Sequence, residues 1–100
     1  MSQDHARRTL IAYDVPDDRR RSKVAKSLER YGDRVQYSVF VVDCSPARMT
    51  RLNQDLEGII NREEDSVLLC DLGLLSSLSD GTFRYIGRNR DITESEAIVF

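Results

Sequence analysis

Thr9-Leu10-Ile11-Ala12-Tyr13-Asp14 is an apolar run that ends on a carboxylate, and it predicts a β-strand with Asp14 at its carboxyl end. A polar turn follows, and then a helix that opens with Arg19-Arg20-Arg21-Ser22-Lys23. One carboxylate and several cations are therefore expected at the same edge of a sheet. This combination suits a divalent metal ion held beside phosphate groups.

The chain is long enough for one domain with a single core, but too short to enclose a deep pocket easily. Its 40% hydrophobic and 32% charged content is that of a folded chain and argues against global disorder. The net charge of −2 is unevenly distributed, because residues 1–34 carry nine Lys/Arg against six Asp/Glu. A local phosphate site is therefore compatible with an acidic chain, whereas indiscriminate nucleic-acid binding is not favoured.

Two cysteines, Cys44 and Cys70, are too few for a disulfide scaffold and lack metal-ligand spacing. Cys70 follows Val67-Leu68-Leu69 and is predicted to be buried. No apolar run approaches the length of a membrane span, and residues 1–8 do not resemble a signal peptide. The cytosol is the expected compartment, and no membrane partner is expected.

Strand and helix signals alternate along the chain. Helical periodicity covers Asp18–Tyr31, with Gly32 as its expected stop, and Pro46–Asn61, with Ser45 as its expected N-cap. Five segments have the apolar or β-branched content of strands: Thr9–Asp14, Arg34–Val42, Ser66–Asp71, Phe83–Ile86 and Ala97–Phe100.

The run Arg34–Val42 is long for one strand, so we expect it to bend near Tyr37-Ser38 and form two. The order then becomes β-α-β-β-α-β, an α+β ferredoxin-like arrangement with both helices on one face of an antiparallel sheet. Alternate residues of this run are expected to point to opposite faces of the sheet, and both groups contain large apolar side chains. This pattern indicates a sheet that is covered on both faces. A second subunit would provide the second cover.

The chain ends on the apolar segment Ala97–Phe100 after a polar stretch. An exposed apolar edge segment promotes aggregation, and pairing with a partner's sheet would cover it. We therefore expect a homodimer that exchanges this strand. The expected organisation is a flexible leader over 1–8, a ferredoxin-like domain over 9–87 and a tail with the exchanged strand over 88–100.

Asp14 is the candidate metal ligand, although an aspartate in this place also suits a helix cap or a partner for arginine. Mg²⁺ usually binds one or two carboxylates together with water and phosphate oxygens. A two-fold axis near Asp14 would supply a second carboxylate.

Four cations in the first turns of the first helix face the positive end of the helix dipole, which is unfavourable for the helix. A phosphate target would explain them, and a solvated charged face is the alternative. The candidate nucleic-acid-binding residues are Arg19, Arg20, Arg21 and Lys23.

Three further residues are supporting candidates. Tyr13 is better explained by core packing, and Arg34 by a phosphate contact or an ion pair. Phe40 is expected to lie on the same strand face as polar residues, and an aromatic ring there favours packing at an interface over stacking on a base. The single histidine, His5, is not expected to be an essential base.

Taken in order, several motifs resemble the CRISPR-associated protein 2 family, which works with the CRISPR integrase in spacer acquisition. The resemblance rests on these motifs: Tyr13-Asp14-Val15-Pro16-Asp17-Asp18, Arg34-Val35-Gln36-Tyr37-Ser38-Val39-Phe40, Asp65-Ser66-Val67-Leu68 and Tyr85-Ile86-Gly87-Arg88. It implies a ferredoxin-like homodimer with an exchanged C-terminal strand and a metal site where two copies of Asp14 meet. It also implies endoribonuclease or endodeoxyribonuclease activity.

By position, the resemblance makes Asp14 the metal-binding catalytic residue, assisted by Tyr13, Arg21, Arg34 and Phe40. From the resemblance we expect a CRISPR adaptation protein, a homodimer that holds duplex DNA through its phosphates and bridges integrase subunits, with a Mg²⁺-dependent endonuclease activity on RNA or DNA as a secondary function. The alternative is a toxin-like nuclease that cleaves messenger RNA. No base-reading pattern is visible, so duplex DNA and single-stranded RNA are both possible partners.

Overall fold

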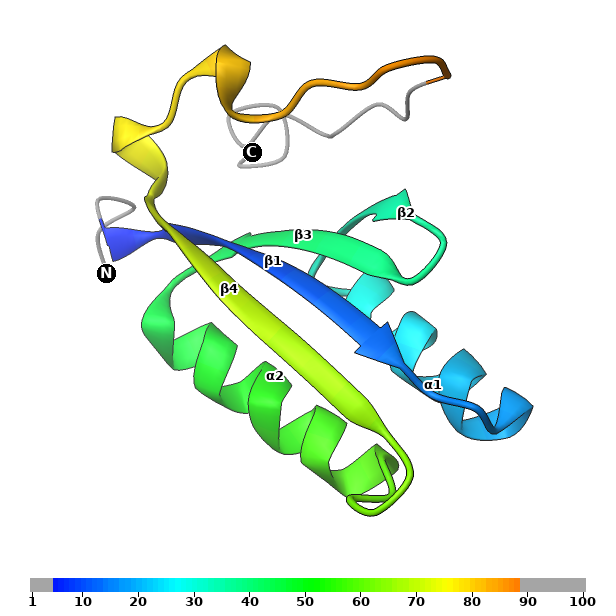
Figure 1. The fold of residues 1–100 in the computed structure, drawn as a ribbon. Helices are drawn as coiled ribbons and strands as arrows, with labels where there is room; N and C mark the ends of the chain where they lie inside the picture. Colours follow the sequence, from blue (N-terminus) through cyan, green and yellow to red (C-terminus); the bar gives the residue numbers. More distant parts are fainter. Residues whose placement is uncertain (1–4, 89–100) are drawn as a thin grey trace.

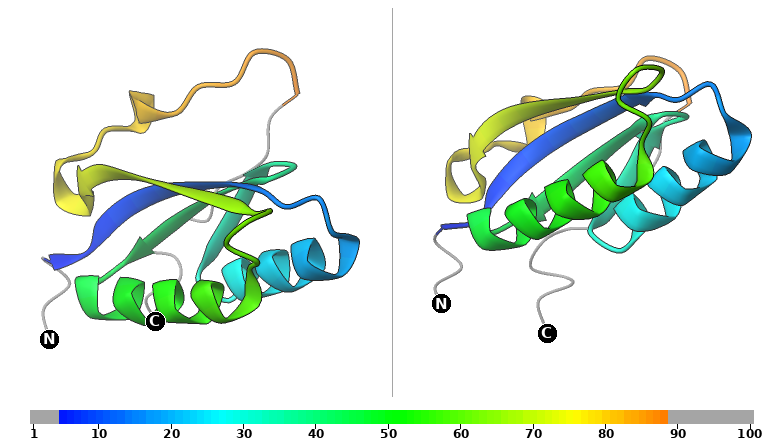
Figure 2. Two further views of the ribbon diagram at one scale, coloured as in Figure 1. Left: turned by 60° about the horizontal axis from the view of Figure 1, so that its bottom comes forward. Right: turned by 90° about the horizontal axis from the view of Figure 1, so that it is seen from below.

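The computed structural model describes residues 5–88 and contains four strands and two α-helices. The elements are β1 (Arg7–Asp14), α1 (Asp18–Glu29), β2 (Gly32–Gln36), β3 (Val39–Cys44), α2 (Pro46–Ile59) and β4 (Ser66–Leu74). The strands pair in the order β2-β3-β1-β4, and every neighbouring pair is antiparallel. Both helices lie on one face of the sheet (Figures 1 and 2). The predicted ferredoxin-like arrangement is confirmed.

The predicted division of the long strand is also confirmed, because Tyr37 and Ser38 form the turn between β2 and β3. The role predicted for Gly32 is wrong. The helix ends at Glu29, and Gly32 is the first residue of β2, without a positive φ. A Cβ atom at Gly32 would lie 2.1 Å from the Val41 carbonyl oxygen, so glycine is required here by the close approach of two strands.

The core lies between the sheet and the two helices. Its largest fully buried side chains include Phe40 and Ile11 from the sheet and Leu28 and Leu52 from the helices. The prediction that Phe40 packs at an intersubunit interface is wrong. A turn and a register shift near Val35 break the alternation assumed along the run, so Phe40 faces the helices.

The outer face of the sheet carries an ion pair and several apolar side chains. Arg8 donates two hydrogen bonds to Asp43, at 2.7 and 2.8 Å, across the β1–β3 pair. Leu68 on β4 is 61% exposed, and Cys70 on the same strand is also exposed, so the prediction of a buried thiol is wrong. An apolar run predicts burial correctly only where both faces of its strand are covered, and β4 is an edge strand.

After β4 the chain forms two short 3-10 turns, Leu75–Ser77 and Asp80–Thr82, and then continues without regular structure to Arg88. The strand predicted over Phe83–Ile86 is therefore wrong. This segment turns away from β4 instead of continuing as a strand (Figure 1). The Phe83 ring centroid lies 5.6 Å from Cζ of Arg8.

The predicted strand Ala97–Phe100 lies outside the described residues. The first strand begins at Arg7, two residues before its predicted start. Neither α1 nor α2 is long and apolar enough to span a lipid bilayer, and the same holds for every helix within 5–88.

Candidate metal and nucleic-acid site

Asp14 is the last residue of β1, and its side chain is exposed. Its neighbour Tyr13 points into the core, so the alternation of a strand places Asp14 on the outer face of the sheet, opposite Ser66. Within residues 5–88 its carboxylate makes no hydrogen bond or ion pair. The residue that caps α1 is instead Asp17, whose carboxylate accepts from the Arg20 backbone N–H at 2.8 Å. Asp14 is thus left available for a ligand.

Arg19 and Lys23 extend from α1 into solvent, one helical turn apart on the same face of the helix. In the described part of the chain neither side chain has a hydrogen-bond or ion-pair partner. These two cations therefore keep their charge available to an external anion, and Arg19 lies in the first turn of α1, directly after the loop that follows Asp14.

Arg20 has a structural role that the sequence pattern did not indicate. Its guanidinium donates to both carboxylate oxygens of Asp65, at 2.7 and 3.1 Å, and to Glu64 at 3.0 Å. The Asp65 side chain is completely buried, and the pKa of Arg20 is raised because it donates to this carboxylate. Arg20 thus joins α1 to the loop before β4, and binding phosphate would require it to leave these partners.

Replacing Asp65 by asparagine is expected to destabilise the protein at neutral pH but to matter little in acid. The pKa of Asp65 is lowered, first because Arg20 donates to it and also because the Asn61 N–H does. Such a carboxylate contributes its full stability above the unfolded pKa of about 3.9 and loses it as the pH falls through the folded pKa. Urea denaturation should therefore give a full stability gap between wild type and Asp65→Asn at pH 7. That gap should close as the pH falls below about 4. An equal gap at both pH values would contradict this account.

Arg21 points back towards the β1–α1 loop. It donates to the carbonyl oxygens of Val15, at 2.9 Å, and Pro16, at 3.3 Å, and it also pairs with Asp18. The pKa of Arg21 is raised because of its hydrogen bond to Asp18. These contacts hold the loop that begins immediately after Asp14, so Arg21 can position the site even where it contacts no ligand.

The other three candidate residues lie on the helix side of the sheet. The rings of Tyr13 and Phe40 stack with their centroids 6.3 Å apart, and Cζ of Arg34 lies 5.2 Å from the Phe40 ring centroid. Burial raises the pKa of the Tyr13 phenol. The sheet therefore separates these three side chains from the outward-facing carboxylate of Asp14 in the same chain.

Tyr37 is a neighbour of this site that the sequence analysis did not include among the site residues. It lies at the tip of the β2–β3 hairpin and is 68% exposed. The hairpin reaches the end of β1, because the Tyr13 N–H donates to the Ser38 carbonyl at 3.0 Å. The predicted bend at Tyr37-Ser38 could have indicated Tyr37 as a site residue, because an aromatic side chain at the tip of a hairpin is exposed unless something covers it.

Within residues 5–88, no three acidic, histidine or cysteine side chains come together in a group that could hold a metal ion. Asp14 nevertheless offers the hard oxygen ligand that Mg²⁺ prefers, and it has no competing partner among these residues. One carboxylate is compatible with Mg²⁺ when water, phosphate oxygens or a second carboxylate complete the coordination.

The fold is that of a small ferredoxin-like protein, with an exposed carboxylate at the end of β1 as a candidate metal ligand and exposed cations on α1 as candidate phosphate-binding residues. The family model for CRISPR associated protein Cas2 matches residues 7–74. The chain belongs to this family, and the resemblance identified from its motifs is confirmed.

Curated relatives agree with this assignment. CRISPR-associated endoribonuclease Cas2 3 of Synechocystis sp. is 53% identical over 58 residues, covering 58% of this chain and 63% of the relative. CRISPR-associated endoribonuclease Cas2 1 of Rhodospirillum rubrum is 33% identical over 90 residues, covering 90% of this chain and 87% of the relative. Across three relatives that are 48–53% identical, the chain spans 48–63% of their own length.

A solved structure extends the comparison beyond the residues that the family model matches. The crystal structure of the hypothetical protein TT1823 from Thermus thermophilus aligns with a TM-score of 0.74 and 27% identity. The alignment covers 88% of this chain and 99% of that one. The similarity therefore includes most of the fold described above.

Proposed function

We propose that this protein acts as a homodimer in CRISPR adaptation, where it binds duplex DNA through phosphates and bridges integrase subunits. We further propose a Mg²⁺-dependent endonuclease activity centred on Asp14. The observation that carries the proposal is the exposed Asp14 carboxylate at the end of β1, without a partner in residues 5–88, in a Cas2-family chain whose next helix carries the exposed cations Arg19 and Lys23.

The exposed edge strand β4 supports the dimer. β4 is an edge strand whose outward residue Leu68 is 61% exposed. A partner's Ala97–Phe100 segment, paired with a sheet edge, would bury apolar groups that are costly to leave in water. The same association would bring the Asp14 of a second copy to the metal.

In the nuclease, Asp14 of each copy would hold the metal through a carboxylate oxygen. Mg²⁺, when bound, supplies charge that polarises the scissile phosphate and lowers the pKa of an attacking water. Arg21 would fix the loop after Asp14, and Arg19 and Lys23 would hold neighbouring phosphates. The exposed ring of Tyr37 could stack on an unpaired base. The names of the relatives, which are called endoribonucleases, favour RNA as the cleaved polymer.

In the scaffold, hydrolysis is not needed. Lysine and arginine contacts to phosphate hold a duplex without reading its sequence, and they make the affinity strongly dependent on salt. Arg19 and Lys23 have the exposure that such contacts require.

The binding part of the proposal can be tested by measuring affinity for a labelled DNA duplex at several salt concentrations. Arg19→Gln and Lys23→Gln should each weaken binding to all sequences similarly and reduce the slope of log affinity against log salt by about one. Arg62→Gln is the control, because it removes one exposed cation on the loop after α2, which is paired with Glu57 at 3.6 Å instead of being open to a ligand. An unchanged slope in both test variants would count against phosphate contact, and a dimer mass in sedimentation should accompany binding.

A further inference from the structure

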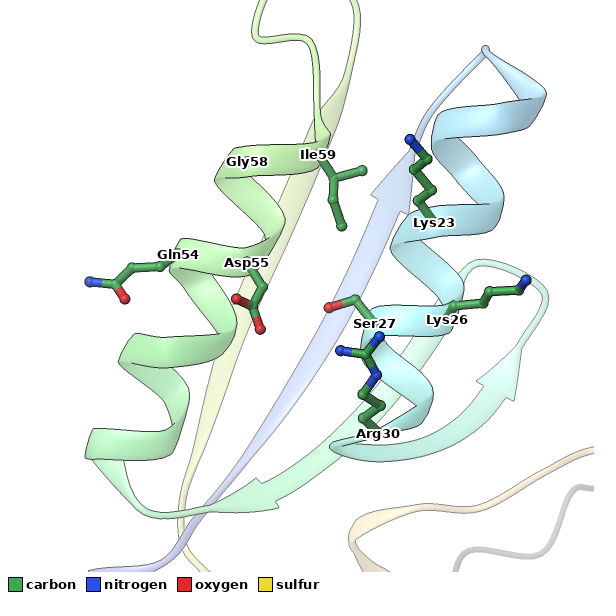
Figure 3. Close-up of a pocket in the computed structure, with 8 residues that line it drawn as sticks. All are labelled: Lys23, Lys26, Ser27, Arg30, Gln54, Asp55, Gly58 and Ile59. Atoms are coloured by element: carbon green, nitrogen blue, oxygen red, sulfur yellow. The ribbon is translucent and has the colours of Figure 1, made fainter.

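A groove of about 500 Å³ runs between α1 and α2 on the helix face of the protein, away from the Asp14 carboxylate. Figure 3 shows Ser27 and Arg30 of α1 pointing into the space between the helices and Asp55 of α2 facing them. Lys23 extends along the same space, and Lys26 also lines the groove, although its amino group is directed away from α2. The groove therefore has one cationic wall, which belongs to α1.

The cations of this wall belong to a longer stripe. Positions four, seven and eleven residues apart fall on one face of an α-helix, and eleven residues span about 16 Å. The stripe consists of Arg19, Lys23, Lys26 and Arg30, whose exposed side chains have no hydrogen-bond or ion-pair partner within residues 5–88. The helix dipole favours Lys26 and Arg30 near the C-terminal end but disfavours Arg19 and Lys23 near the start. Helix stability alone therefore does not explain the stripe.

The Ser27 hydroxyl is an independent indication of a ligand. Ser27 is only 5% exposed and lines the groove, and among the residues that the structure describes its Oγ has no hydrogen-bond partner. A buried hydroxyl without a partner costs free energy, and such groups are uncommon in folded proteins. An oxygen acceptor placed in the groove between Arg30 and Lys23 would accept a hydrogen bond from it.

We infer that this groove binds a segment of the phosphodiester backbone, so that the nucleic-acid track continues from the start of α1 along the helix face. The inference rests on the proposed nucleic-acid binding and extends it to a second surface. A polymer of regularly spaced anions matches a stripe of four cations better than a single free anion does. The carboxylate of Asp55, which already accepts from the Tyr31 hydroxyl at 3.3 Å, would repel such an anion, so the cations of α1 must outweigh this repulsion.

Gly58 provides a way to test the groove without weakening the fold. A Cβ atom at Gly58 would meet no atom within 4 Å, and Gly58 lines the groove within α2. Gly58→Glu therefore adds a negative charge to the groove and removes a poor helix former. Arg30→Gln removes a positive charge from the opposite wall. Arg62→Gln, outside the groove, changes the net charge by the same amount and is the control.

The experiment is a DNA and RNA binding titration of the full chain at about 50 to 200 mM salt. Arg30→Gln and Gly58→Glu should each weaken binding several-fold, and Arg30→Gln should lower the salt slope by about one, while Arg62→Gln behaves as wild type. Asp55→Asn should strengthen binding, because it removes the opposing charge. Unfolding curves at fixed protein concentration should confirm that each variant is folded.

The outcomes separate this inference from the proposed function. If Arg19→Gln and Lys23→Gln weaken binding but Arg30→Gln and Gly58→Glu match the Arg62→Gln control, the groove inference is overturned and the proposed function stands. If the wild type binds no nucleic acid, both fail. If Arg30→Gln weakens integrase binding but leaves DNA and RNA binding unchanged, the groove holds an acidic protein surface, and the inference is again overturned.

Discussion

Asp14→Asn is expected to abolish the proposed Mg²⁺-dependent cleavage while leaving the fold intact. The amide removes the negative charge that attracts the metal. Metal charge stabilisation is worth several kcal/mol, so the cleavage rate should fall by about 100-fold or more. The Asp14 side chain is exposed and has no partner within residues 5–88, so the free energy of unfolding should change by about 0.5 kcal/mol or less. Cleavage assays with and without Mg²⁺, together with urea denaturation, measure the two effects.

The same variant separates the possible biological roles when cleavage and spacer acquisition are assayed in parallel. If the variant loses cleavage but still supports spacer acquisition, the scaffold role is selected. If it loses both activities, the catalytic role is selected. A wild-type protein that cleaves messenger RNA but does not bind the integrase would indicate the toxin-like nuclease. Glu63→Gln is the matched control, because it removes an exposed carboxylate from the loop after α2. Equal loss of cleavage in Glu63→Gln would show a general charge effect and contradict the role of Asp14.

The parts of the fold that depend on local pattern could be predicted from the sequence. The helix starts at Asp17 and Ser45 carry their capping residues, and both caps accept the expected backbone hydrogen bonds. The division of one long apolar run at Tyr37-Ser38 followed from strand length alone. The strand predicted over Phe83–Ile86 failed because β-propensity does not specify a partner strand, and the chain turns away from the sheet before this segment.

The candidate site was predictable in its residue types but not in its ion pairs. The run of cations at the start of α1 was visible in the sequence, yet nothing local distinguishes Arg20 from Arg19. The distinction comes from Asp65, 45 residues further along the chain, which folding brings beneath the Arg20 guanidinium. The groove that contains Ser27 and Arg30 depends in the same way on α2 lying beside α1, which no pattern within α1 indicates.

Phe40→Ala is expected to lower the free energy of unfolding by about 3–5 kcal/mol, since it removes a fully buried aromatic ring and leaves a cavity. For a domain of this size the loss is a large part of a total stability of about 5–15 kcal/mol. Phe40 stacks on Tyr13 and lies against the Arg34 guanidinium, so its loss would also disturb those two residues. Urea denaturation at fixed protein concentration measures the effect.

This expectation changes how activity data for Phe40 must be interpreted. Loss of cleavage in Phe40→Ala would follow from unfolding or from a displaced β1, and so would not identify a catalytic group. Phe40→Leu provides the comparison, because it keeps the core filled but removes the ring, and it should cost clearly less stability. If Phe40→Leu is folded and cleaves normally, Phe40 acts through packing. A folded, stable Phe40→Ala protein would contradict its place in the core, and a folded but inactive Phe40→Leu protein would point to a direct role for the ring.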